Sequence, residues 1–157
     1  MSKRIMVDMS ATLLHHGHTR LLKKAAELGD VIVALTTDDE VEKTKGYTPE
    51  LRYEERKEIL ESIRYVVEVV PSTWLIDEAF MEKHHCDLLV HGHDNVNHIP
   101  SEKLVILPRT EGISSSNLRE RVLDCLIALN LKGKPTNSSD TIARLLIETI
   151  KKEFRLE

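Results

Sequence analysis

DVIVALTT, residues 30–37, is the segment from which the expected architecture follows, because it is a continuous run of apolar and β-branched residues. Such a run is typical of a strand in a parallel sheet that is buried on both faces. The preceding segment, HTRLLKKAAELG at 18–29, has apolar residues at helical spacing, and Gly29 is a natural stop. We therefore expect a helix that leads directly into a central strand.

The same alternation continues on both sides of this segment. Expected strands lie at 4–9, 30–37, 67–72, 87–94 and 104–110, and expected helices at 18–29, 51–66, 73–86, 114–130 and 140–154. The polar segment DDEVEKTKGYTPE, 38–50, is expected to be a mobile loop. The pattern predicts an α/β fold with a doubly wound, mostly parallel sheet. We place the main domain at 1–130 and a C-terminal helical extension, packed on it or at a dimer interface, at 131–157.

Composition narrows the class of protein. The chain has 157 residues, a formal net charge of -4, and no apolar run near the roughly 20 residues of a membrane helix. The acidic balance argues against a nucleic-acid partner. Its two isolated cysteines, Cys86 and Cys125, are expected to be buried and reduced. We expect a cytoplasmic protein with neither a membrane nor a nucleic acid as partner.

Four of the expected strands end in or are followed by segments rich in histidine, charged residues or serine. The segments are SATLLHHGH (10–18), TTDDEVEKTKG (36–46), HGHDN (91–95) and PRTEGISSS (108–116). Ligands of open parallel sheets bind beyond the carboxyl ends of the strands, so these segments are expected to converge on one site.

His15 and His18 begin an expected helix, and their spacing places them on one side of it. Gly17 between them permits close approach of a ligand to the backbone. A helix N-terminus favours phosphate, and two imidazoles there can donate hydrogen bonds to a phosphoryl transition state. A solvated helix start is the commoner explanation of a bare HxxH pair, and a metal site is a third.

A second helix beginning carries serines. Ser114 and Ser115 open the expected helix at 114–130, after Arg109 at a strand end. Two such beginnings could hold a polyphosphate from two sides, although a serine there is usually only a cap. Lys43 and Lys45 lie in the expected loop, which could close over the phosphates, although loop lysines are usually just solvated.

These segments together resemble a known superfamily, the nucleotidyltransferases with an HxGH motif and an ISSS/T motif. LLHHGHTRLLKKAAELGD, KTKGY, YEERKEILESIRYVVEVVPS and PRTEGISSS are most similar to the bacterial glycerol-3-phosphate cytidylyltransferases, over about residues 4–122. The resemblance implies a Rossmann-like nucleotidyltransferase fold. It also implies transfer of CMP from CTP to a small phosphorylated or phosphonate acceptor, with Mg²⁺ accompanying CTP, in a homodimer. RTEGIS favours CTP over ATP.

The resemblance also implies roles for individual residues. Catalytic roles fall to His15, His18, Lys45 and Arg109. Nucleotide or phosphate contacts fall to Ser10, Thr12, Gly17, Lys43, Asp94, Thr110, Ser114 and Ser115. Acceptor contacts fall to Arg56, Arg64 and Trp74. No metal ligand is assigned.

The chain departs from the family where GTFD usually precedes HxGH. The matching positions are Met9, Ser10, Ala11 and Thr12, so an aspartate is lost, while Asp8 is an additional acidic residue nearby. Val67 and His93 also replace residues that are commonly acidic. These departures leave the identity of the acceptor open.

Two other functions stay open from the sequence. A metal-dependent hydrolase could use a cluster made of His15, His18, His91, His93 and Asp94. A non-catalytic nucleotide sensor could have kept the fold and lost turnover, given the altered segment before HxGH.

Overall fold

The computed structural model describes residues 2–92, 94, 96–131 and 146–152. It divides into two compact units, residues 1–111 and 112–157, and each is described by itself. The predicted boundary at residue 130 adjoins residues outside the described ones, so the predicted division stays a prediction.

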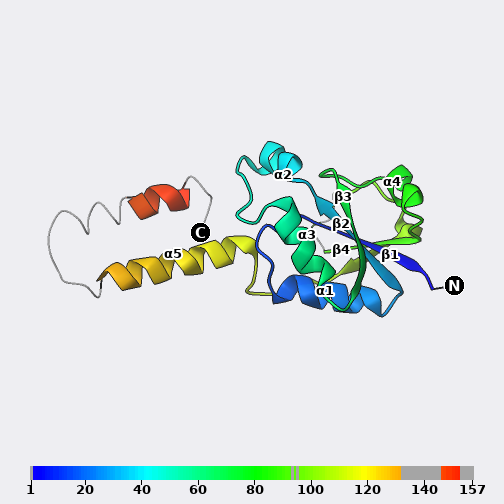
Figure 1. Cartoon of the computed structure of the whole chain (residues 1–157), viewed down its shortest axis with the longest axis horizontal. Coiled ribbons are helices and arrows are strands. Elements are labelled where there is room, and N and C mark those ends of the chain that lie inside the picture. Colours follow the sequence, from blue (N-terminus) through cyan, green and yellow to red (C-terminus); the bar gives the residue numbers. More distant parts are fainter. Residues whose placement is uncertain (1, 93, 95, 132–145, 153–157) are drawn as a thin grey trace. The chain divides into compact units, whose positions relative to one another are not determined.

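The first unit is built on a five-stranded sheet whose pairs are all parallel. The strands are β1 (Arg4–Met9), β2 (Asp30–Thr36), β3 (Val66–Ser72), β4 (Leu88–Gly92) and β5 (Leu104–Leu107). Their spatial order is β3-β2-β1-β4-β5, so the chain winds outward from β1 on one side and then on the other (Figure 1). The doubly wound α/β prediction is confirmed, and its switch point lies between β1 and β4.

Alternating residues of the strands fill two cores, one on each face of the sheet. Ile5 and Val7 pack on one face with residues of α1 (His16–Ala26) and α3 (Tyr53–Glu61). Met6 lies on the other face, where α4 (Glu78–Lys83) and the segment before it contribute. Both faces are therefore covered (Figure 1), and the polar residues that follow the strands in the sequence are left at the sheet's carboxyl edge.

The predicted loop at 38–50 is wrong over most of its length, because Asp38–Lys45 forms a helix, α2. Acidic residues occupy its first turn and Val41 is fully buried, while Gly46 ends it in the left-handed conformation with φ 76°. Because only one of the eight residues of α2 is buried, its sequence lacks the apolar spacing from which a helix is predicted. The expected helices at 51–66 and 73–86 are shorter in the structure, as α3 and α4 show.

The second unit contains α5 (Ser115–Leu131) and a helical segment at 146–152. The two meet through Lys151, whose Nζ lies 3.7 Å from Glu120 Oε1 and 3.8 Å from Asp124 Oδ1. The expected loop at 133–139 lies outside the described residues. Cys125 is exposed and Cys86 half-buried, so the expected burial of Cys125 is wrong. In the described ranges, no helix combines the length and apolarity needed to span a membrane.

Candidate active site

The beginning of α1 is built by the two histidines that the sequence singled out. His15 is the N-cap, and its Nδ1 accepts a hydrogen bond from the Gly17 N–H at 3.1 Å. His18 Nδ1 accepts one from the His15 N–H at 3.2 Å. The ring centroids lie 3.9 Å apart, so the two imidazoles point together as expected. The helix begins two residues before the expected start at His18, because imidazole here replaces the usual capping side chains.

This capping fixes the protonation of both rings. A ring nitrogen that accepts a backbone N–H carries no proton, so each neutral imidazole carries its proton on Nε2. Burial, with the charge of His15, Arg109 and Lys45, lowers the pKa of His18 to about 3. Burial also lowers the pKa of His15, and so do the charges of His16 and Arg109. Near neutral pH the pair therefore offers two neutral Nε2–H donors beside a helix N-terminus.

Lys45, Ser10 and Trp74 meet at the same edge of the sheet. Lys45 is the last residue of α2, and its Nζ donates to Ser10 Oγ at 3.0 Å. The same Nζ lies 5.3 Å from the centroid of the Trp74 ring. Ser10 follows β1 and Trp74 follows β3, so three of the predicted site residues converge from separate parts of the sequence.

Arg109 and Asp94 form an exposed ion pair beyond β4 and β5. Arg109 Nη1 lies 3.4 Å from Asp94 Oδ2, and both side chains are about half exposed. Because the Arg109 charge lowers the pKa of both His15 and His18, the guanidinium lies within electrostatic reach of the imidazole pair. A basic residue there suits a phosphate-bearing ligand.

Asp8 and His91 form a pair at the switch point that sequence reasoning did not assign. Asp8 Oδ2 lies 3.5 Å from His91 Nε2 and accepts a hydrogen bond from Asn97 Nδ2 at 2.9 Å. Asp8 Oδ1 is buried and has no hydrogen-bond partner among the described residues. Burial raises the pKa of Asp8, although His91 and Asn97 act in the opposite direction. The sequence did contain one indication of this pair, because Asp8 interrupts the apolar residues of the expected strand at 4–9.

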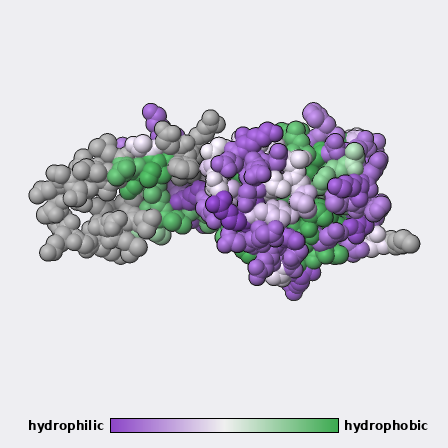
Figure 2. Space-filling model, turned by 45° about the horizontal axis from the view of Figure 1, so that its top comes forward, coloured by the Kyte–Doolittle hydropathy of each residue, from purple (hydrophilic) through white to green (hydrophobic). Residues whose placement is uncertain are grey.

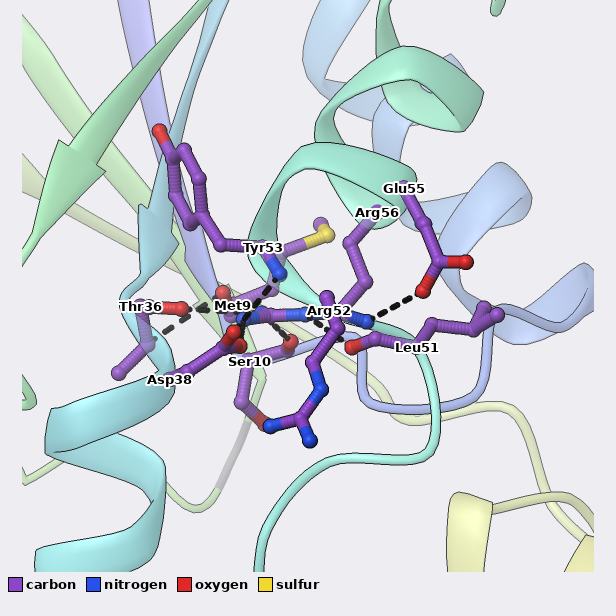
Figure 3. Close-up of polar contacts among 9 residues, drawn as sticks. All are labelled: Met9, Ser10, Thr36, Asp38, Leu51, Arg52, Tyr53, Glu55 and Arg56. Carbon is purple, nitrogen blue, oxygen red and sulfur yellow. Dashed lines mark hydrogen bonds and ion pairs between the residues drawn. The ribbon is translucent and has the colours of Figure 1, made fainter.

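Arg56 does not lie in the acceptor position that the sequence predicted. Its side chain is 1% exposed and forms an ion pair with Asp38, with Nη2 to Oδ1 at 2.6 Å. Its remaining hydrogen bonds go to the carbonyl oxygens of Ser10, Thr36 and Leu51 (Figure 3). Since four of its five N–H donors are used within the protein, Arg56 holds the ends of β1 and β2 rather than a ligand.

Two other predicted residues, Arg64 and Lys43, have exposed side chains. Arg64 lies two residues before β3, at the amino edge of the sheet and opposite to His15, and its Nη2 donates to the Tyr65 hydroxyl at 3.0 Å. Its predicted acceptor contact stays a prediction. Lys43 is 77% exposed and lies 3.6 Å from Glu40 on the surface of α2. Lys43 and Lys45 both belong to α2 rather than to the predicted loop.

The remaining predicted residues are Thr12, Thr110, Ser114 and Ser115. Thr12 is fully buried, and Thr110 lies half-buried after β5. Ser114 Oγ accepts the Asn117 N–H at 3.0 Å and so caps α5. Ser114 and Ser115 belong to the second unit, and their convergence with the histidines on one triphosphate stays a prediction.

Comparison with known proteins shows the family to which the chain belongs. A family model described as cytidylyltransferase-like matches residues 11–121. The chain is 40% identical over 128 residues to a glycerol-3-phosphate cytidylyltransferase of Staphylococcus aureus, covering 76% of this chain and 95% of that protein. It is 32% identical over 134 residues to an ethanolamine-phosphate cytidylyltransferase of Dictyostelium discoideum, covering 78% of this chain and 37% of that one.

A solved structure supports the fold independently. The lipopolysaccharide core biosynthesis protein of Thermoplasma volcanium superposes with a TM-score of 0.59 at 17% identity, covering 71% of this chain and all of that one. The comparisons give no support to the hydrolase or the sensor. Within the described part of the chain, which omits His93, no group of three His, Cys, Asp or Glu side chains is arranged to hold a metal ion.

Proposed function

The chain belongs to the cytidylyltransferase-like family, and from that premise we propose that it transfers CMP from CTP to a small phosphorylated acceptor. A phosphate oxygen of the acceptor attacks the α-phosphorus of CTP in line, and pyrophosphate leaves from the opposite side. The products are a CDP-linked compound and pyrophosphate. No covalent bond to the protein forms, so catalysis depends on positioning and on stabilising charge.

The observation that carries this proposal is the capped imidazole pair at the beginning of α1. Nδ1 of His15 and Nδ1 of His18 are both occupied as acceptors, so Nε2–H is the only donor of either neutral ring. Donors that are already oriented stabilise charge as it develops on phosphoryl oxygens without a cost of reorganisation. Lys45 and Arg109 supply positive charge to the same reaction.

We propose that Mg²⁺ enters with CTP rather than binding to a site made wholly by the protein. Mg²⁺ usually keeps several waters and is held by substrate phosphates with one or two carboxylates. Asp94, exposed at the carboxyl edge and 3.4 Å from Arg109, is a carboxylate that could help to hold the ion. The ion would offset charge on the triphosphate.

We also propose a cytoplasmic homodimer. Figure 2 shows apolar surface on the second unit. Exposed apolar side chains there support an interface: Val122 at 58% exposed, Leu146 at 57% and Ile150 at 38%. Light scattering after size-exclusion chromatography would give twice the mass of one chain. A monomeric mass at micromolar concentration would contradict the dimer.

The test of the reaction is a screen of phosphorylated acceptors with CTP and Mg²⁺, read by pyrophosphate release and by the mass of the CDP-linked product. ATP in place of CTP tests the choice of nucleotide. His18→Ala is expected to lower turnover by about a hundredfold or more, as for loss of one transition-state donor. The matched control is His85→Ala, since His85 is exposed and follows α4, at the opposite edge of the sheet. Pyrophosphate release from no acceptor, or wild-type turnover in His18→Ala, would contradict the proposal.

A further inference from the structure

Asp8 and His91 present two hydrogen-bond acceptors to the same point. His91 Nδ1 lies 3.0 Å from the Gly92 carbonyl oxygen and 3.9 Å from Asp94 Oδ1, so Nδ1 carries a proton. In the neutral ring Nε2 is then an acceptor, and it lies 3.5 Å from Asp8 Oδ2, which is also an acceptor. Two facing acceptors repel each other unless a proton is shared between them or a donor group lies between them, and a ligand can supply that donor.

The ligand that best suits this point carries a positive charge. Asp8 is 11% exposed, and its Oδ1 is buried without a partner among the described residues, so the hydrogen bond from Asn97 to Oδ2 compensates an ionised Asp8 only in part for its lost hydration. A neutral hydroxyl donates one hydrogen bond and brings no charge. An ammonium group donates up to three and compensates the carboxylate, and its binding would displace the shared proton to solvent.

The position of the pair connects it to the predicted acceptor side of the site. Asp8 and His91 lie on β1 and β4, which flank the switch point where ligands bind in such sheets. Asn97, which donates to Asp8, also accepts the Ile76 N–H at 2.7 Å, two residues after Trp74. Through this amide, Asp8 is linked to the segment that follows Trp74, a predicted acceptor residue. Asp8 is also the only carboxylate between Arg4 and His15.

We propose that Asp8, together with His91, binds a protonated amino group of the acceptor, so that the substrate is a phosphorylated amino alcohol. This rests on the proposed CMP transfer and specifies its acceptor. Asp8 is then a specificity-determining residue, and Asn97 positions it. The amino group binds beside β1 and β4 while the acceptor phosphate faces the imidazole pair.

The decisive comparison uses two acceptors of the same size with the wild-type protein, ethanolamine phosphate and 2-hydroxyethyl phosphate. They differ only in an ammonium group against a hydroxyl. We expect kcat/KM for ethanolamine phosphate to be higher by at least about 100-fold, since a site built for a polar group rejects analogues that lack it. Glycerol 3-phosphate, as a third acceptor, should behave like the hydroxyl compound. Equal use of the two matched acceptors, or preference for glycerol 3-phosphate, overturns this inference and leaves CMP transfer intact.

The variant Asp8→Asn then tests whether Asp8 is the residue that determines this preference. Asp8→Asn keeps the shape and removes the charge, and we expect it to reduce the preference to a few-fold while the KM for CTP stays unchanged. Asp30→Asn, at the exposed amino end of β2, is the control and should keep the wild-type preference. An unchanged preference in Asp8→Asn, or an equal loss for both acceptors, overturns the assignment. Should Asp8→Asn not fold, the wild-type comparison still decides, whereas absence of product from every acceptor contradicts CMP transfer itself.

Discussion

His18 couples the chemistry of the site to stability, because its pKa differs between the folded and unfolded protein. The folded pKa is about 3, below the ordinary 6.5, so the unfolded state binds the proton more tightly. The stability that His18 contributes is therefore complete above pH 6.5 and falls as the pH decreases toward 3. Between pH 7 and 5 the loss amounts to about 2 kcal/mol.

The measurement is urea unfolding of the wild type and of His18→Gln at both pH values. Glutamine can accept the His15 N–H through its amide oxygen but does not titrate. We expect the wild type to lose about 2 kcal/mol more than the variant between pH 7 and 5. The comparison cancels other titrating groups, including Asp8, whose raised pKa acts in the opposite direction. Parallel losses in the two proteins would mean that His18 titrates normally.

Arg56 and Arg64 were both predicted to bind the acceptor, and the structure separates them. Arg56→Lys keeps the charge but cannot reproduce the planar donors that reach Asp38 and three carbonyl oxygens. We expect it to lower the free energy of unfolding by about 3 kcal/mol. Arg64 is exposed and hydrogen-bonded to its neighbour Tyr65, so Arg64→Lys should change the free energy of unfolding by less than about 0.5 kcal/mol. Urea midpoints of both variants test this, and equal midpoints would remove Arg56 from its structural role.

Among the helices and strands, the turn between α1 and β2 is the junction that a single methyl group can disrupt. A Cβ at Gly29 would lie 2.1 Å from the Lys3 carbonyl oxygen, which accepts the Asp30 N–H at 2.8 Å. Gly29→Ala must therefore separate the start of β1 from β2, at a cost of about 2 kcal/mol or more. Gly46→Ala is the matched comparison, because a Cβ there meets nothing within 4 Å and costs only the left-handed conformation, about 1 kcal/mol. Thermal midpoints in the reverse order would contradict the steric argument.

The strands were predictable because their apolar runs record burial on both faces, as DVIVALT in β2 shows. α2 was not predictable from the sequence. Its only buried residue is Val41, and a single apolar residue cannot show the repeated spacing that indicates a helix. For a similar reason the sequence could not show that Arg56 is structural while Arg64 is exposed. Local sequence does not record that the Arg56 side chain folds back onto Ser10, 46 positions away.

For the molecule as a whole, the sequence indicated the fold class and the edge that carries the site, because both follow from the alternation of elements. It did not indicate the spatial order of the strands. That order places Asp8 beside His91 and brings Asn97 to Asp8, 89 positions away. The histidine motif was predictable because it is local to one helix beginning, whereas the Asp8–His91 pair exists only after β1 and β4 are joined.

The division into two units gives a prediction about the complete chain. Both apolar cores consist of residues between Ile5 and Leu107, so a protein that ends at Glu111 retains them. We expect this truncated protein to unfold cooperatively on heating. It lacks Ser114 and Ser115, which are predicted to hold the triphosphate, and we expect its affinity for CTP to fall by at least about tenfold, the effect of 1.4 kcal/mol.

The full-length double variant Ser114→Ala, Ser115→Ala separates the loss of these hydroxyls from the loss of the whole second unit. A comparable drop in CTP affinity, measured by calorimetry, would assign the effect to the serines. A smaller drop would assign the remainder to other parts of the second unit, among them the backbone N–H groups at the beginning of α5, which the double variant keeps and the truncation removes. Normal CTP binding by the truncated protein would contradict the predicted convergence of the two helix beginnings, because the phosphates would then be held by the first unit alone.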